Sequence, residues 1–470
     1  MGAGAPPASP TESSRFVLPV LIYCGLCTAV ISSLGVLLIP TIAEAQGVSL
    51  STGQWILTIS SFTAAVSTPV LGRLADRGDP RKVLLAALGV VALGSLLAAT
   101  ATNFAVLLLG RGLQGVTFGI VPVTMTLARR HLPVERLQAG VAALSVTAVT
   151  GIGLGYPLTG AVAEYGDYRA AFWIAVAFAG SALVVVPFVL PHSPPAQRAT
   201  DPFDVGGAVL LGVGLGSGLL ALAESTRWGW SSPATPGLLA ASAVLLTLWV
   251  RWELRAPAPL VRLDLLRLPD VRLAQVSALV FWLAMFGSFA ASGTLAQSPE
   301  GAGYGPSLSA FAAGFVILPL SIGSQLASRI GVRLARRAGP RAVLVIGAVA
   351  VVVANAGLYG HHAETWQLIF GMFVLGLGVG VALSTMPLLL LGAVPGDQLG
   401  SSMAANGVLR QVGGSIASAM VGALLAAHTA GGLATDAGYD RTFGIGAGIG
   451  LALTIWLVWA TIRSRSAPAS

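Results

Sequence analysis

Charged residues are scarce in this chain: Asp, Glu, Lys and Arg make up 9% of 470 residues, against 55% hydrophobic residues and a mean hydropathy of +0.83. That composition leaves too little polar surface to coat a water-soluble globule. Cysteine is nearly absent, and Cys24 and Cys27 form a C-x-x-C pattern inside an apolar run. Without a βαβ context this pattern is not a redox motif, so we interpret both thiols as packing residues.

Sequence motifs that would indicate a catalytic site are also absent. The sequence contains no H-E-x-x-H and no G-x-S-x-G motif, and we predict no catalytic residue, no enzyme activity, no cofactor and no metal site. Neighbouring His361 and His362 are expected in a solvated loop, because adjacent residues rarely complete a ligand geometry unaided. Residues 110–115 fit G-x-G-x-x-G, but they lie within an apolar run that follows no strand, so a dinucleotide site is rejected.

Long apolar runs fill most of the chain. At about 20 residues for each membrane crossing, they predict an all-α polytopic membrane protein with fourteen transmembrane helices. The expected spans are 16–41, 53–72, 83–102, 104–128, 138–162, 170–190, 204–223, 235–250, 273–296, 308–328, 342–360, 366–392, 402–427 and 442–461.

The positive-inside rule tests this count, because one missed helix would reverse the side of every later loop. Most of the 26 basic residues then fall in cytoplasmic segments, whereas Arg169, Arg227 and Arg441 fall outside and Arg111 and Arg410 fall inside helices. We therefore expect a multi-pass plasma-membrane protein with both termini cytoplasmic. The net charge of +8 follows from topology and requires no nucleic-acid partner.

An internal repeat relates the two ends of the chain. Residues 72–82 form a charged stretch between two apolar segments, and residues 333–341 repeat it 260 positions later. The repeat predicts two pseudo-symmetric six-helix bundles with a two-helix insert. The expected divisions are a disordered cytoplasmic tail (1–15), an N-terminal bundle (16–191), an insert and linker (192–272), a C-terminal bundle (273–462) and a second cytoplasmic tail (463–470).

The stretch Gly72-Arg73-Leu74-Ala75-Asp76-Arg77, together with this architecture, resembles the major facilitator superfamily, in particular its fourteen-helix drug:proton antiporter branch. The resemblance covers the chain from about Pro19 to Ile462. Asp79 and Pro80 depart from the Gly and Arg of the family pattern. The family resemblance implies membrane lipid and a small-molecule substrate as partners, and it implies that the protein functions as a monomer.

A carboxylate at a helix end near arginines can hold neighbouring helices together on the cytoplasmic side. We predict a conformational latch that favours the outward-facing state and is formed by Gly72, Arg73, Asp76, Arg77 and Arg81. A simple topogenic charge cluster is the alternative, above all for Arg81. The second copy carries Arg336 in place of Asp76, so we expect a weaker grip there.

Two arginines within predicted spans are candidate coupling or cavity residues. An arginine inside a span costs about 2.5 to 3.5 kcal/mol on insertion scales and should face a cavity or a partner. Arg111 and Gln114 resemble the family's second motif, which implies a link to proton coupling, and packing against backbone carbonyls is the alternative. Arg410 lies in the helix that mirrors the fifth span, and we weigh cavity lining equally against packing.

The predicted fifth span carries Gly151, Gly155, Pro157 and Gly160. Small residues permit close helix approach and proline permits bending, so these positions are a candidate hinge. They resemble the family's antiport motif, although Tyr156 precedes the proline where that motif has glycine. A plain packing seam is the alternative.

The family resemblance implies alternating-access export of amphipathic or hydrophobic organic compounds, driven by the proton gradient. The acidic residue usual in the first helix of this branch is missing from residues 30–40, so the proton carrier is unnamed. The same absence disfavours strongly cationic substrates. Alternatives are a dedicated metabolite exporter or importer of the same fold and, ranked lower, a non-transporting membrane sensor or a membrane enzyme.

Overall fold

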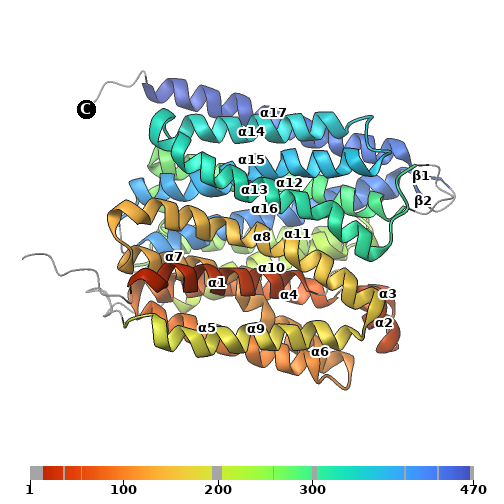
Figure 1. Ribbon diagram of the computed structural model, residues 1–470, viewed down its shortest axis with the longest axis horizontal. Helices are drawn as coiled ribbons and strands as arrows, with labels where there is room; N and C mark the ends of the chain where they lie inside the picture. The colour runs from red at the N-terminus through yellow and green to blue at the C-terminus, as the bar shows by residue number, and fades with distance from the viewer. Residues whose placement is uncertain are drawn as a thin grey trace, which may run out of the picture.

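Long parallel and antiparallel helices make up the computed structural model, which describes residues 14–34, 38–53, 55–192, 204–257, 259–298, 304–395, 398–430 and 433–465 (Figure 1). Within these ranges fourteen helices are long and apolar enough to cross a membrane. This confirms the predicted all-α fold with fourteen spans. Most residues of the two predicted tails lie outside the described ranges.

The first half of the molecule lies below the second half in Figure 1. The spanning elements of the first half are α1 (Ser14–Ser33), α4 (Trp55–Arg77), α5 (Pro80–Ala99), α6 (Phe104–Gln114) with η1 (Gly115–Gly119) and α7 (Ile120–His131), α8 (Val134–Tyr165) and α9 (Tyr168–Val189). Those of the second half are α12 (Pro269–Ala296), α13 (Ala310–Ala338), α14 (Pro340–Leu358), α15 (Thr365–Ala393), α16 (Leu399–Ala427) and α17 (Asp436–Arg465).

The first span is shorter than the predicted 16–41. Helix α1 ends at Ser33, and after a segment outside the described residues the chain forms α2 (Ile39–Ala45) and α3 (Leu50–Gly53). Pro40 lies at the start of α2, where its missing N–H is tolerated, whereas in the interior of a longer helix it would remove a hydrogen bond. The sequence therefore restarts a helix at this point.

The fourth span is interrupted where the sequence predicted one continuous helix. Five residues form the 3₁₀ segment η1 between α6 and α7. A Cβ atom added at Gly115, in η1, would collide with the Ser60 carbonyl oxygen of α4. In the second half, Gly376 stands in the same relation to the Leu320 carbonyl of α13, so equivalent positions of the repeat make equivalent helix contacts.

The two inserted helices are α10 (Val205–Trp228) and α11 (Ala234–Glu253), followed by the 3₁₀ turn η2 (Leu263–Arg267). Leu211 and Leu215 of α10 share an apolar cluster with Ala65 of α4, and Val408 and Val412 of α16 pack against that cluster. The insert thus covers the seam between α4 in the first half and α16 in the second.

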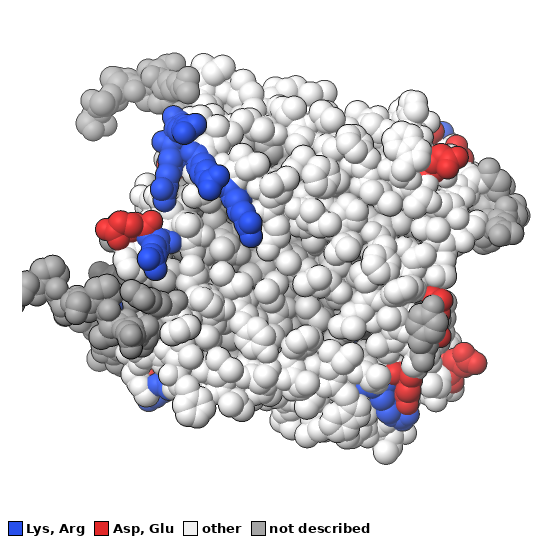
Figure 2. Space-filling view, viewed as in Figure 1, with Lys and Arg blue, Asp and Glu red and all other residues white. Residues whose placement is uncertain are grey.

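A two-stranded antiparallel hairpin, β1 (Thr429–Ala430) and β2 (Leu433–Ala434), joins α16 to α17, with Thr429 opposite Ala434. The hairpin lies at the same end of the molecule as α2 and α3 (Figure 1). Most basic side chains visible in Figure 2 gather toward the opposite end, where α13 ends with Arg336 and Arg337 in its last turn. We call the basic end inner and the hairpin end outer.

His362 corrects one sequence prediction. It was expected in a solvated loop, but its side chain is only 3% exposed. Its Nε2 lies 2.9 Å from an Asp436 carboxylate oxygen and its Nδ1 lies 2.8 Å from the Leu358 carbonyl oxygen. The loop folds back onto the start of α17 because these polar partners satisfy both ring nitrogens.

Candidate functional site

Asp76 lies in the last turn of α4 and is 2% exposed. Its carboxylate accepts hydrogen bonds from the backbone N–H groups of Gly400 at 2.8 Å and Ser401 at 2.6 Å, and from the Thr126 hydroxyl at 3.3 Å. Helix α16 begins at Leu399, so both amides belong to the first turn, whose N–H groups have no partner within their own helix. An acid of one half thereby caps a helix of the other half, with a favourable helix dipole.

Two glycines make this contact possible. A Cβ atom added at Gly72 would lie 2.8 Å from the Gly400 carbonyl oxygen and 2.6 Å from the Ala404 Cβ. A Cβ atom added at Gly400 would lie 2.5 Å from the Thr126 hydroxyl and would collide with the Asp76 carboxylate. Close approach of α4 and α16 therefore depends on the absence of side chains at both positions.

Arg130, which was not among the predicted site residues, caps the inner end of α4. Its guanidinium donates to the carbonyl oxygens of Ala75 at 3.2 Å, Asp76 at 3.0 Å and Gly78 at 3.2 Å. A cation at the last carbonyls of a helix interacts favourably with the helix dipole. The sequence signal for Arg130 was its position as a basic residue in the last turn of the neighbouring span, α7.

The other predicted latch residues, Arg73, Arg77 and Arg81, do not all make the same kind of contact. Arg81 donates to the Pro187 carbonyl at 2.7 Å and to His192 Nε2 at 2.8 Å, so it ties α5 to the end of α9 within the first half. Arg73 and Arg77 are half-buried in α4 and both have interaction partners. Of the five predicted residues, the structure places Gly72 and Asp76 directly against the second half.

Arg111 and Gln114 form a pair inside the first half. Arg111 is 1% exposed and donates from its NH1 group to Gln114 Oε1 at 2.7 Å. Gln114 in turn donates to the Ser95 hydroxyl at 2.9 Å, and Ser60 donates to the Arg111 carbonyl at 2.8 Å. The two side chains therefore join α6 to α5, while the Ser60 bond adds α4.

The candidate hinge positions lie within α8, which runs as one helix through Pro157. A Cβ atom at Gly151 would collide with Ala29 of α1, and the space around Gly155 is filled by Ser33 of the same helix. Pro157 faces α13, where a Cβ at Gly314 would lie 3.0 Å from it. Gly160, also in α8, is buried. These contacts place three of the four residues at helix seams.

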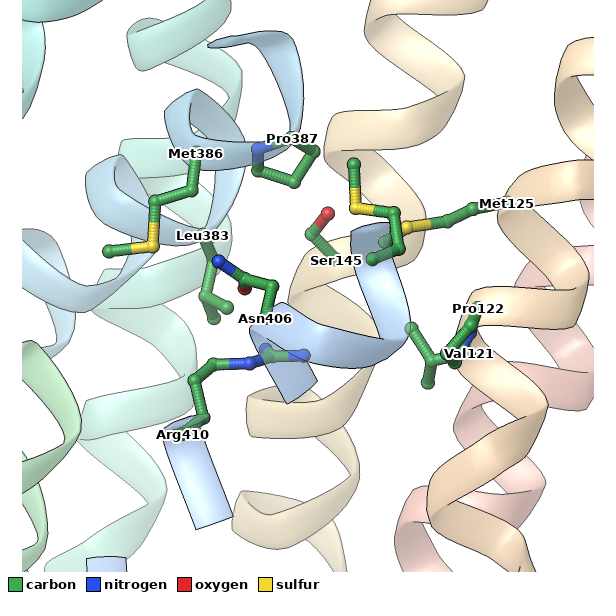
Figure 3. Close-up of a pocket in the computed structure, with 10 residues that line it drawn as sticks. Val121, Pro122, Met125, Ser145, Leu383, Met386, Pro387, Asn406 and Arg410 are labelled. Atoms are coloured by element: carbon green, nitrogen blue, oxygen red, sulfur yellow. The ribbon is translucent and has the colours of Figure 1, made fainter. Parts of the chain in front are cut away.

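A small cavity lies between the halves (Figure 3). Its walls come from α7 and α8 of the first half and α15 and α16 of the second. The lining residues are Val121, Pro122, Met125, Ser145, Leu383, Met386, Pro387, Met403, Asn406 and Arg410. Of the three predicted coupling or cavity residues only Arg410 belongs to this lining, whereas Asn406 and Ser145 line it without having been predicted.

The halves also contact each other on the outer side of this cavity. Tyr156 of α8 and Phe289 of α12 meet edge to face, with ring centroids 5.3 Å apart. The Ser321 hydroxyl of α13 donates to the Val149 carbonyl of α8 at 2.5 Å. With the Asp76 contact at the inner end, the cavity is bracketed by contacts between the halves on both sides.

Two six-helix halves of repeated construction, joined around a cavity in the membrane interior, define a polytopic protein of the secondary-transporter class. The chain belongs to the Major Facilitator Superfamily, whose family model matches residues 20–418. This confirms the family resemblance of the charged stretch at residues 72–82.

Curated relatives carry transporter and drug-resistance names. An uncharacterized MFS-type transporter of Mycobacterium tuberculosis is 29% identical, with 90% of this chain aligned to 61% of its length. The multidrug resistance protein Stp of Mycobacterium tuberculosis is 26% identical over 83% of this chain and 72% of its own. A putative multidrug resistance protein, MdtD, of Escherichia coli is 27% identical over 92% of this chain and 90% of its own.

Among solved structures, the crystal structure of the human organic anion transporter MFSD10 (TETRAN) has a TM-score of 0.70 to this chain. The superposition covers 96% of this chain and 100% of the MFSD10 chain, at 17% sequence identity. At that identity the likeness establishes the shared fold.

Proposed function

We propose that this protein exports amphipathic or hydrophobic organic compounds across the plasma membrane by alternating access, in exchange for protons and as a monomer. The observation that carries the proposal is a contact between the halves: the Asp76 carboxylate of the first half accepts hydrogen bonds from the first turn of α16 in the second half. Because α4 and α16 belong to different halves, breaking this contact is a necessary step in opening the cavity to the inner side.

The apolar lining of the cavity supports the proposal that the substrate is an organic compound. Its lining is mostly apolar, with Met125, Met386 and Met403 among the residues and few polar groups. Flexible thioether side chains adapt to ligands of different shape, as expected for a binding site with broad substrate range. The drug-resistance names of Stp and MdtD agree with this class of substrate.

Proton exchange is the less direct part of the proposal. Within the described lining of the cavity the one ionisable side chain is Arg410, and an arginine does not release its proton at physiological pH. Arg111 can instead tune a nearby carrier through its bond to Gln114. A dedicated metabolite carrier of the same fold would share all of these features.

The test is transport by purified protein in liposomes under an imposed pH gradient, with anionic, neutral and cationic compounds as substrates. We expect movement of at least one organic compound that ceases when the gradient is collapsed. If no compound moves, export is contradicted; if compounds move at the same rate without a gradient, proton exchange is contradicted.

Arg111→Lys tests the coupling role of this residue. Lysine keeps the charge but loses the planar fork that reaches Gln114, so gradient-driven transport should fall while insertion is preserved. Unchanged gradient-driven transport in this variant would exclude a directional hydrogen-bonding role.

A further inference from the structure

Arg410 places a positive charge at the wall of the cavity without an acidic partner in that wall. Asp and Glu are absent from the described lining residues. The Arg410 Nε atom is buried and makes no hydrogen bond within the described part of the chain. A cation at membrane depth is costly unless it faces a partner or a water-filled cavity, and buried donors without acceptors add to that cost.

An aromatic ring fixes the orientation of this side chain. The guanidinium carbon of Arg410 lies 5.0 Å from the ring centroid of Trp282 in α12. Figure 3 shows the side chain extending from α16 into the cavity region near Asn406. Stacking on an aromatic ring leaves the edge of the planar guanidinium, with its N–H groups, available to a bidentate acceptor such as a carboxylate.

Asn406 lies one helical turn before Arg410 and is also held in place. Its Nδ2 donates to the Ala274 carbonyl oxygen of α12 at 3.1 Å. Ser145, across the cavity on α8, donates its hydroxyl proton to the Val141 carbonyl at 2.8 Å. The Ser145 hydroxyl therefore has its proton engaged and Asn406 has one of its two N–H groups engaged, whereas Arg410 supplies the charged hydrogen-bond donors of the lining.

The rest of the wall suits an apolar body. Met125 comes from the first half, and Met386 and Met403 come from the second, so a ligand on Arg410 would contact both halves. The space that the two halves enclose in this state is small, so a ligand with an apolar body binds only when the halves move apart around it.

We propose that Arg410 is the recognition residue for an organic anion whose carboxylate binds the guanidinium while its apolar body lies against the methionine side chains of the cavity wall. The assignment of this anion as the transported substrate rests on the export function proposed above, whereas its binding does not. The Asp76 contact lies at the inner end of the same helix α16, so an anion on Arg410 and the latch act on one element.

Equilibrium binding to purified protein in nanodiscs tests the proposal directly. Tritiated 2-naphthylacetate is the probe, and competition is measured with its neutral analogue 2-naphthylacetamide and with the cation 2-(2-naphthyl)ethylammonium. We expect saturable binding of the acetate and at least about tenfold weaker competition by the amide and the cation, as the loss of a charge-assisted hydrogen-bond pair implies.

Arg410→Gln should reduce binding of 2-naphthylacetate at least about tenfold and abolish its advantage over the amide. Arg410→Lys should retain part of that advantage because the charge remains. Arg463→Gln is the matched control, since Arg463 also stacks on a tryptophan, Trp459, at 5.1 Å but is exposed at the end of α17. Its binding should match the wild type.

Several results would overturn the proposal: no saturable binding of 2-naphthylacetate, equal competition by acid and amide, or unchanged binding in Arg410→Gln. Binding of chloride or phosphate in isothermal titration calorimetry, without binding of the naphthyl compounds, would show an inorganic anion site instead and overturn the proposal. A correctly folded Arg410→Gln protein is verified by its thermal midpoint. Because no gradient is applied, absent proton coupling leaves these outcomes unchanged.

Discussion

The inner ends of α4 and α13 occupy equivalent places in the repeat, yet they meet the opposite half in different ways. Asp76 of α4 accepts two backbone hydrogen bonds at the start of α16. Arg336, its counterpart in α13, lies near the start of α8 and donates from Nε to Gln138 Oε1 at 3.4 Å. A helix N-terminus favours an anion and disfavours a cation, so one copy is a strong contact and the other a weak one.

The α8–α13 seam is held mainly by a neutral hydrogen bond and by packing instead. Ser321 bonds to the Val149 carbonyl at 2.5 Å, and Gly314 permits close contact with Pro157. Among the described residues, the charged contact across this seam is the long bond from Arg336 to Gln138, and its loss should release little. We therefore propose that, of the two seams that the repeat creates, the α4–α16 seam is the one whose charged contact controls opening at the inner end.

Asp76→Asn should produce the largest effect on this difference. Asparagine keeps one acceptor oxygen but loses the charge, and a hydrogen bond to a charged group contributes about 1.5 to 3 kcal/mol. We expect transport in liposomes to fall about tenfold, with the amount of inserted protein unchanged. Wild-type rates in this variant would refute the latch.

Gly72→Ala should separate α4 from α16 by steric conflict with Gly400 and Ala404. Overpacking costs about 1 to 3 kcal/mol, so transport should decrease several-fold and the thermal midpoint should fall. Gly89→Ala in α5 is the matched control, because an added Cβ there meets no atom within 4 Å. Equal behaviour of the two variants would show that close approach at Gly72 is unimportant.

Arg336→Asp should make the weak seam resemble the strong one. A carboxylate near the start of α8 gains about 0.3 to 1 kcal/mol from the helix dipole. We therefore expect stronger closure of the inner end and transport slowed about two- to fivefold, measured beside Arg336→Ala. Faster transport in Arg336→Asp than in Arg336→Ala would contradict the dipole argument.

Arg336→Gln should have the smallest effect. The side chain is exposed and its bond to Gln138 is long, so its loss should change transport less than about twofold. An effect as large as that of Asp76→Asn would mean that both copies act as latches.

The number of spans and the repeat could be predicted from the sequence because hydropathy, loop arginines and residue spacing are local or periodic signals. Helix ends were less predictable: α1 stops before Pro40, and η1 interrupts the fourth span where Gly115 meets α4. Such breaks depend on the packing partner, which a single sequence does not reveal.

The site was predicted in part for the same reason. Asp76 stood out as an acid among basic residues, but its partners Gly400 and Ser401 lie 324 and 325 positions away and bond through backbone atoms that carry no sequence signature. Arg410 stood out as a charge within a span. Its neighbour Asn406 did not, because a lone asparagine in an apolar helix lacks a comparable signal.

The central claim, that Asp76 holds the inner end closed, is tested most directly by the distance between the halves at that end. Spin labels at Leu74 of α4, which is 39% exposed, and at Gly392 of α15, where an added side chain has open space, report this distance by double electron–electron resonance. Asp76→Asn should shift the distribution to longer distances, and Arg336→Gln should leave it unchanged. An unshifted distribution in Asp76→Asn would contradict the account.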